Sequence, residues 1–111
     1  MIDQVRPAEL AAWMRSHGAG GVVLDVREPA ELRTASIKPD GFKLVTIPMN
    51  EIPQRLAELD ASRPVACLCH HGARSQRVAM FLAANGFTDV ANIAGGIDLW
   101  SREVDPSVPS Y

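Results

Sequence analysis

The feature that most constrains the fold is residues 64–75, which have the sequence PVACLCHHGARS. Residues 65–68 form a short apolar run after a proline, a pattern typical of a central strand in a parallel sheet. Helical periodicity begins after this run, with Ser75 as the predicted N-cap and the Asn-Gly pair at 85–86 as the predicted stop. The stretch therefore predicts a buried strand, a tight turn and a helix, with Cys69 at the carboxyl end of the strand.

The predicted turn places Cys69 opposite the amino end of a helix. Such an end carries unpaired backbone N–H groups and about half a positive charge, which together favour an anion. Gly72 permits backbone angles that bring N–H groups together, and Arg74 adds a permanent positive charge. We therefore expect the Cys69 thiol to ionise readily and to act as a nucleophile, because the thiolate is the reactive form of cysteine.

Cys69, four intervening residues and Arg74, followed by a helix, resemble the active-site loop of the rhodanese family of sulfurtransferases. In that family the catalytic cysteine takes up a sulfane sulfur and becomes a persulfide, which backbone N–H groups of the loop surround. The resemblance implies that Cys69 is the catalytic residue. The substrate-binding residues that it implies are His70, His71, Gly72, Ala73, Arg74 and Ser75.

Two further segments resemble the rhodanese family, so that the likeness covers almost the whole chain. One is the sequence LDVREPAEL at residues 24–32, and the other is the glycine pair at 95–96 followed closely by Trp100. Residues 36–41 depart from the family, because Ser-Ile-Lys-Pro-Asp-Gly replaces the His-Ile-Pro-Gly-Ala element of many rhodaneses. We expect Trp100 to pack in the core or at its rim rather than to bind substrate.

Asp25 and Arg27 lie at the carboxyl end of the predicted strand at 22–26. Ligands of open α/β sheets bind at the carboxyl ends of the strands, so this pair is expected on the same rim as Cys69. Two roles are open for the pair: contact with a ligand, or an ion pair in which Asp25 binds an arginine and holds the rim together. We favour the structural role, because buried carboxylates are usually paired.

Length and charge limit the number of domains and the classes of partner that the chain can have. A chain of 111 residues suffices for one core, and we expect a rhodanese-like domain over 1–104 and an extended C-terminal tail over 105–111. The net charge of −2 provides no basic surface for nucleic acid. No apolar run approaches the length of a membrane span, and residues 1–10 do not resemble a secretory signal, so we expect a cytoplasmic protein.

Strands are predicted at 22–26, 44–47, 65–68 and 89–93, and they alternate with helical segments. Such alternation requires right-handed crossovers between parallel strands. It predicts an α/β fold, with a small, mainly parallel sheet flanked by helices on both faces. The rhodanese-like fold has this architecture.

The second thiol and the two histidines have less specific surroundings. Cys67 lies inside the predicted strand, and we expect a buried structural residue, with a resolving thiol as the alternative. A metal site formed by Cys67, Cys69, His70 and His71 is disfavoured, because five consecutive residues that begin on a strand can hardly close a tetrahedron. We therefore expect no metal, with both histidines at the mouth of the pocket or facing solvent. The resemblance to the rhodaneses implies that no cofactor is needed.

The resemblance implies a rhodanese-type thiosulfate sulfurtransferase. It further implies that Cys69 takes sulfur from thiosulfate or a persulfide donor and passes it to a thiol, cyanide or a small redox protein. One alternative is a cysteine phosphatase or arsenate reductase, but resembling phosphatases have five residues between cysteine and arginine, and a smaller ring suits sulfur better than phosphate. The other alternative is a sulfur carrier or docking module that serves one dedicated protein.

Overall fold

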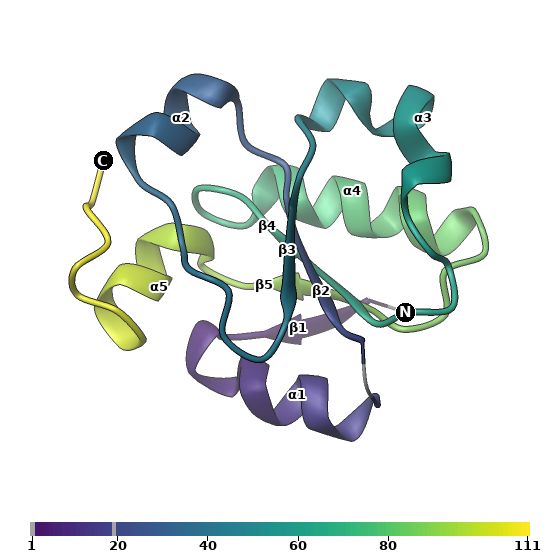
Figure 1. Ribbon diagram of the computed structural model, residues 1–111, viewed down its shortest axis with the longest axis horizontal. Coiled ribbons are helices and arrows are strands. Elements are labelled where there is room, and N and C mark those ends of the chain that lie inside the picture. Colours follow the sequence, from purple (N-terminus) through teal and green to yellow (C-terminus); the bar gives the residue numbers. More distant parts are fainter. Residues whose placement is uncertain (1, 19) are drawn as a thin grey trace.

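The computed structural model describes residues 2–18 and 20–111, and its centre is a five-stranded sheet (Figure 1). The strands are β1 (Asp3–Val5), β2 (Val22–Asp25), β3 (Lys43–Thr46), β4 (Val65–Leu68) and β5 (Val90–Ile93). Their order across the sheet is β1-β5-β4-β2-β3, and all neighbouring strands are parallel. The predicted parallel α/β fold is confirmed, and Cys69 follows directly after the central strand β4.

Helices cover both faces of this sheet (Figure 1). The α-helices are α1 (Leu10–Ser16), α2 (Pro29–Thr34), α3 (Ile52–Arg55), α4 (Ala73–Ala84) and α5 (Gly96–Glu103). Short 3-10 turns precede α1, precede α3 and follow α3, at η1 (Pro7–Glu9), η2 (Met49–Glu51) and η3 (Leu56–Glu58). Helices α1 and α5 pack on one face, and α3 and α4 pack on the other.

The alternation of side chains along β4 divides the core into two clusters. Ala66 and Leu68 belong to the cluster on the α1 and α5 face, whereas Val65 and Cys67 belong to the cluster on the α3 and α4 face. Cys69 continues the second row. Both thiols therefore lie on the side of the sheet that α4 covers.

Strand β1 is absent from the prediction because its sequence lacks a strand pattern. It has three residues, of which only Val5 is buried, and it pairs with β5 alone at the edge of the sheet. Pairing with a neighbour that is distant in the sequence, rather than local propensity, thus makes it a strand.

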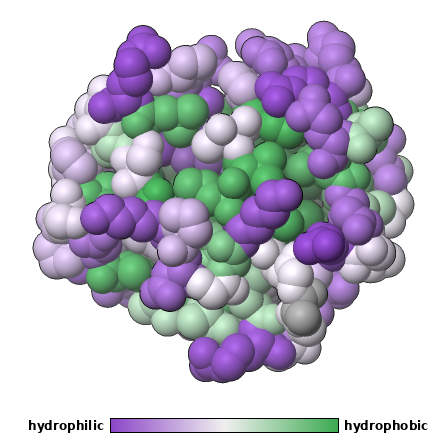
Figure 2. Space-filling view, viewed as in Figure 1, coloured by the Kyte–Doolittle hydropathy of each residue, from purple (hydrophilic) through white to green (hydrophobic). Residues whose placement is uncertain are grey.

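The surface combines apolar and polar regions. Figure 2 shows apolar side chains gathered in the middle of the viewed face, with hydrophilic side chains around them. Within residues 2–18 and 20–111, no helix has the length and apolar character needed to cross a membrane.

Candidate active site

Cys69 lies between the end of β4 and the beginning of α4, and it is 1% exposed. The first turn of α5 holds this loop from outside: the backbone N–H of Ile97 donates to the carbonyl oxygen of Cys69 at 2.9 Å, and that of Asp98 donates to the carbonyl oxygen of His70 at 3.1 Å. Gly96 makes this approach possible, since a Cβ atom there would collide with both carbonyl oxygens. The loop is therefore fixed by backbone contacts.

Gly72 shapes the turn that follows Cys69. Its φ of 110° lies in the left-handed region that favours glycine, and it is the N-cap of α4. Its backbone N–H donates a hydrogen bond to Sγ of Cys69, with an N–S distance of 3.0 Å. A Cβ at Gly72 would lie 3.3 Å from the backbone nitrogen of Gly95, so the turn has little room for a side chain.

The prediction that Ser75 is the N-cap is wrong. Helix α4 begins earlier, at Ala73, because Gly72 already adopts the cap conformation. Ser75 instead lies in the first turn of the helix and is fully buried. Its Oγ is 3.2 Å from Sγ of Cys69 and donates to Oδ1 of Asn92 at 2.5 Å. The hydroxyl is thus a polar neighbour of the sulfur rather than a helix cap.

Asn92 of β5 sets the orientation of that hydroxyl. Its Nδ2 donates to the carbonyl oxygen of Gly72 at 3.2 Å and to Oε1 of Gln4 at 2.9 Å, which leaves Oδ1 facing Ser75. A serine hydroxyl has one proton, so it donates either to Asn92 or to the sulfur. Rotation of this hydroxyl can therefore supply a donor when negative charge develops on Sγ of Cys69.

Arg74 points from the first turn of α4 to Glu31 of α2. Its Nη1 donates to Oε1 of Glu31 at 2.7 Å, and its Nη2 donates to Oε2 at 2.9 Å. The hydrogen bonds from Arg74 lower the pKa of Glu31 to about 2, and those to Glu31 raise the pKa of Arg74. Because arginine has five N–H donors, three remain for other partners, although Glu31 balances the positive charge.

A buried ion pair lies at the end of β2. Arg27 Nη2 is 2.7 Å from Oδ2 of Asp25, and both side chains are at most 1% exposed. The expected pairing of Asp25 with an arginine is confirmed. Arg27 Nη1 also donates to the carbonyl oxygen of Glu31 at 3.3 Å and to the hydroxyl of Tyr111 at 3.1 Å. Burial opposes the charge of Arg27, but the hydrogen bonds to Asp25 and Tyr111 outweigh it and raise the pKa of Arg27.

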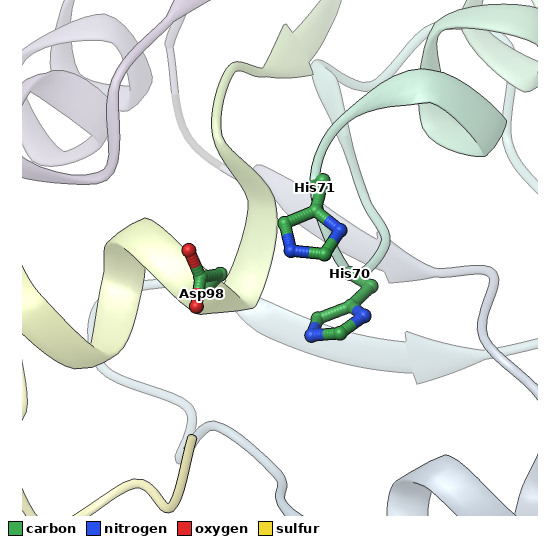
Figure 3. Close-up of side chains that lie close together, drawn as sticks. All are labelled: His70, His71 and Asp98. Atoms are coloured by element: carbon green, nitrogen blue, oxygen red, sulfur yellow. The ribbon is translucent and has the colours of Figure 1, made fainter. Parts of the chain in front are cut away.

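His70 and His71 lie in the loop beside Asp98 of α5 (Figure 3). Their ring centroids are 3.8 Å apart with an angle of 32° between the planes. Each of the three residues has a potential metal-binding atom within 4.8 Å of the others, and across residues 2–18 and 20–111 this group stands alone. It includes neither cysteine, and Asp98 already accepts a hydrogen bond from Arg102.

Three residues around Cys69 are missing from the prediction: Glu31, Asn92 and Tyr111. Asn92 has a usable signal, because it is a polar residue inside a predicted buried strand. Glu31 belongs to a segment that resembles the rhodanese family, but nothing near it in the sequence indicates Arg74 as its partner. Tyr111 is the single tyrosine of the chain, and no local pattern connects it with residues 27, 31 and 70.

Comparison with known proteins relates this site to one family. Residues 6–103 match the family described as Rhodanese-like domain. The chain is 36% identical over 94 residues to the thiosulfate sulfurtransferase GlpE of Pseudomonas syringae pv. syringae, with coverage of 85% of this chain and 83% of that protein. It is 40% identical over 93 residues to the chloroplastic Rhodanese-like/PpiC domain-containing protein 12 of Arabidopsis thaliana. That alignment covers 80% of this chain but only 30% of the Arabidopsis protein.

Solved structures show the same relationship. A rhodanese-related protein from Thermoplasma volcanium has a TM-score of 0.78 and 30% identity, with coverage of 98% of this chain and 99% of that chain. The CoADR-RHD protein of Bacillus anthracis has a TM-score of 0.79 and 30% identity, but this chain covers only 18% of its length. The fold thus occurs both as a chain of similar length and as part of a longer protein.

Proposed function

The chain belongs to the rhodanese-like domain family, and from this premise we propose that it is a sulfurtransferase that carries sulfur on Cys69. The observation that supports this role most directly is the backbone N–H of Gly72, 3.0 Å from Sγ at the amino end of a 12-residue helix. Such a donor stabilises negative charge on sulfur, both in the thiolate and in a persulfide.

The first half of the proposed reaction loads the enzyme. The Cys69 thiolate attacks the outer sulfur of thiosulfate, a new S–S bond forms, and the bond to the sulfite sulfur breaks. Sulfite leaves with the electron pair, and Cys69 becomes a persulfide. A persulfide donor reacts in the same way and releases a thiol.

The second half discharges the persulfide. An acceptor thiolate, cyanide or a small redox protein attacks the terminal sulfur, and the Cys69 thiolate is released. Neither half requires a metal or an organic cofactor. Since discharge depends on reduced thiols, we propose a cytoplasmic setting, in which thiols are kept reduced.

The loop after Cys69 would bind the donor. We assign the N–H groups of the loop and the free guanidinium donors of Arg74 to the sulfonate and the transferred sulfur. The rings of His70 and His71 would form the outer wall. The proposed substrate-binding residues are His70, His71, Gly72, Ala73, Arg74 and Ser75.

Intact-mass spectrometry after incubation with thiosulfate tests the proposal. The wild-type protein should gain the mass of one sulfur atom and lose it on addition of cyanide. Cys69→Ser should gain nothing, whereas the matched control Cys67→Ser should load fully, because Cys67 lies inside β4. Loading of Cys69→Ser, or no loading of the wild-type protein, would show that the assignment is wrong.

A further inference from the structure

Residues 105–111 turn back onto the domain after α5. Val108 is 4% exposed, and its carbonyl oxygen accepts a hydrogen bond from Oγ of Ser101 at 2.6 Å. Its backbone N–H donates to the carbonyl oxygen of Asp105 at 3.1 Å. This anchor allows the segment beyond Val108 to reach the rim of the sheet where Cys69 lies.

Tyr111 contacts the beginning of the active-site loop through its ring. The ring is stacked on that of His70, the residue after the nucleophile, with centroids 3.8 Å apart and planes 5° apart. The ring of His71 is also 3.8 Å from that of His70, centroid to centroid, with an angle of 32° between the planes. The position of His70 is therefore set by contacts with two neighbouring rings.

Through its hydroxyl, Tyr111 is linked indirectly, by way of Glu31, to Arg74 at the end of the same loop. The hydroxyl donates to Oε2 of Glu31 at 2.8 Å and accepts from Nη1 of Arg27 at 3.1 Å. Glu31 in turn holds the guanidinium of Arg74 with two hydrogen bonds. Tyr111 and Glu31 together thus connect His70 with Arg74, at the two ends of the loop.

These contacts lie next to a nucleophile that has little exposed surface. A sulfur donor must touch Sγ, yet Cys69 is only 1% exposed in this arrangement. Tyr111 itself is 37% exposed and is held by a stack and two hydrogen bonds, so it can move without unfolding of the core. These contacts can be released while the backbone hydrogen bonds from α5 to Cys69 and His70 stay in place.

We propose that Tyr111 is a positioning residue that closes the loop around Cys69, and that it must release His70 and Glu31 before a sulfur donor reaches the thiol. This inference rests on the proposed function for its biological meaning, but its physical content is access to Cys69. Closure would keep the persulfide away from water and unsuitable thiols between loading and discharge. Residue 111 would therefore select which acceptors reach the sulfur.

Alkylation by iodoacetamide measures this access without sulfur transfer. Proteolysis and peptide mass spectrometry would give the labelling rates of Cys69 and Cys67 separately. In Tyr111→Ala, Cys69 should label about tenfold faster than in the wild-type protein, because closure no longer opposes access. Tyr111→Phe keeps the ring and loses the hydroxyl, so its rate should lie between the two. Cys67 should stay unlabelled in all three proteins, since it is fully buried.

The outcomes separate a closing residue from a merely structural one. Equal Cys69 labelling in the wild-type protein and Tyr111→Ala would overturn the proposal. Labelling of Cys67 in step with Cys69 would also overturn it, because it would indicate general loosening of the fold. Faster Cys69 labelling in a protein that takes up no sulfur from thiosulfate would leave the closing role intact and refute the sulfurtransferase assignment.

Discussion

Cys67 and Cys69 are two residues apart, face the same side of the sheet and are equally hidden, at 0% and 1% exposure. Cys67 belongs to an apolar cluster, and burial raises its pKa, an effect to which the neighbouring Cys69 adds. Cys69, in contrast, has a backbone N–H and a hydroxyl against its sulfur. The depth of burial therefore does not distinguish the two thiols, whereas the polar groups around the sulfur do.

The difference arises from the point at which β4 ends. Inside the strand, Cys67 is paired with Leu24 of β2 and Asn92 of β5, and backbone N–H groups are used by the sheet. Beyond the strand the chain turns, and the N–H of Gly72 points to Sγ of Cys69. Two positions further along the chain, the cysteine sulfur thus has hydrogen-bond donors beside it that the sulfur inside the strand lacks.

Gly72→Ala should abolish most of the difference between the surroundings of the two thiols. Its effect on sulfur loading should be the largest of those predicted. A left-handed φ costs a residue other than glycine about 1–3 kcal/mol, and the new Cβ would press on the backbone of Gly95. The turn must shift, and its N–H then leaves the sulfur. Sulfur loading of Cys69, followed by intact mass at timed intervals, should slow about 100-fold, as on loss of one oxyanion donor.

Gly86→Ala is the matched control for this substitution. Gly86 also has a left-handed φ, of 93°, but nothing lies within 4 Å of its potential Cβ, and it is at the far end of α4. In denaturant unfolding it should lose the stability that the left-handed φ costs, without the added contact with Gly95, and it should load sulfur at the wild-type rate. If Gly72→Ala also loads at the wild-type rate, its N–H has no role at the sulfur.

Ser75→Ala should have a smaller effect in the same direction. The variant removes the hydroxyl that is 3.2 Å from Sγ and leaves Oδ1 of Asn92 without its donor. The unsatisfied amide should lower the free energy of unfolding by about 1–3 kcal/mol. Loading should slow about tenfold, because one neutral donor to the developing charge is lost.

Ser101→Ala separates the loss of stability in Ser75→Ala from the loss of a hydroxyl next to the sulfur. Ser101 is also a buried serine, and its hydroxyl donates to the carbonyl oxygen of Val108 rather than to the site. It should lose comparable stability in denaturant unfolding, and because it loosens the segment that carries Tyr111, its loading should be as fast as in the wild-type protein or faster. Equal slowing in both variants would mean that stability, and not contact with the sulfur, determines the rate.

The sequence predicts the region of Cys69 well because its determinants are local. A short apolar run, a glycine and a following helix lie within one continuous stretch, so the strand, the turn and the position of the thiol follow from periodicity and turn chemistry. Even there the beginning of α4 is misplaced. Ser75 has the side chain of a typical cap, but the left-handed conformation of Gly72 supplies the cap two residues earlier.

The partners of the loop cannot be predicted in the same way, because they come from distant segments. Arg74 and Glu31 are 43 positions apart, and Tyr111 is 80 positions from Glu31. Sheet order brings these residues to one rim, and a single sequence contains no signal for such pairings. Strand β1 is missing from the prediction for the same reason, since its pairing with β5 defines it.

Acid titration should reveal a further, smaller contrast, because Arg74 of the loop that follows Cys69 forms an ion pair with Glu31. The pKa of Glu31 falls from 4.5 to about 2 in the folded protein. A lowered pKa contributes stability that is full above pH 4.5 and lost as the pH falls towards 2. Glu31→Gln should therefore lower the free energy of unfolding by about 1–2 kcal/mol at pH 6, after allowance for solvent screening, and by almost nothing near pH 2.

Glu58→Gln provides the matched control for Glu31→Gln. Glu58 also forms two hydrogen bonds with an arginine, Arg55, but its side chain is 53% exposed, against 20% for Glu31. Solvent screens exposed pairs. The loss of unfolding free energy, measured with urea between pH 2 and pH 6, should therefore depend less on pH for Glu58→Gln than for Glu31→Gln. Equal changes would mean that the pair beside Cys69 behaves as an ordinary surface pair. Arg74 could then turn to a sulfur donor without release of Tyr111. The ion pair would then not contribute to closing the loop.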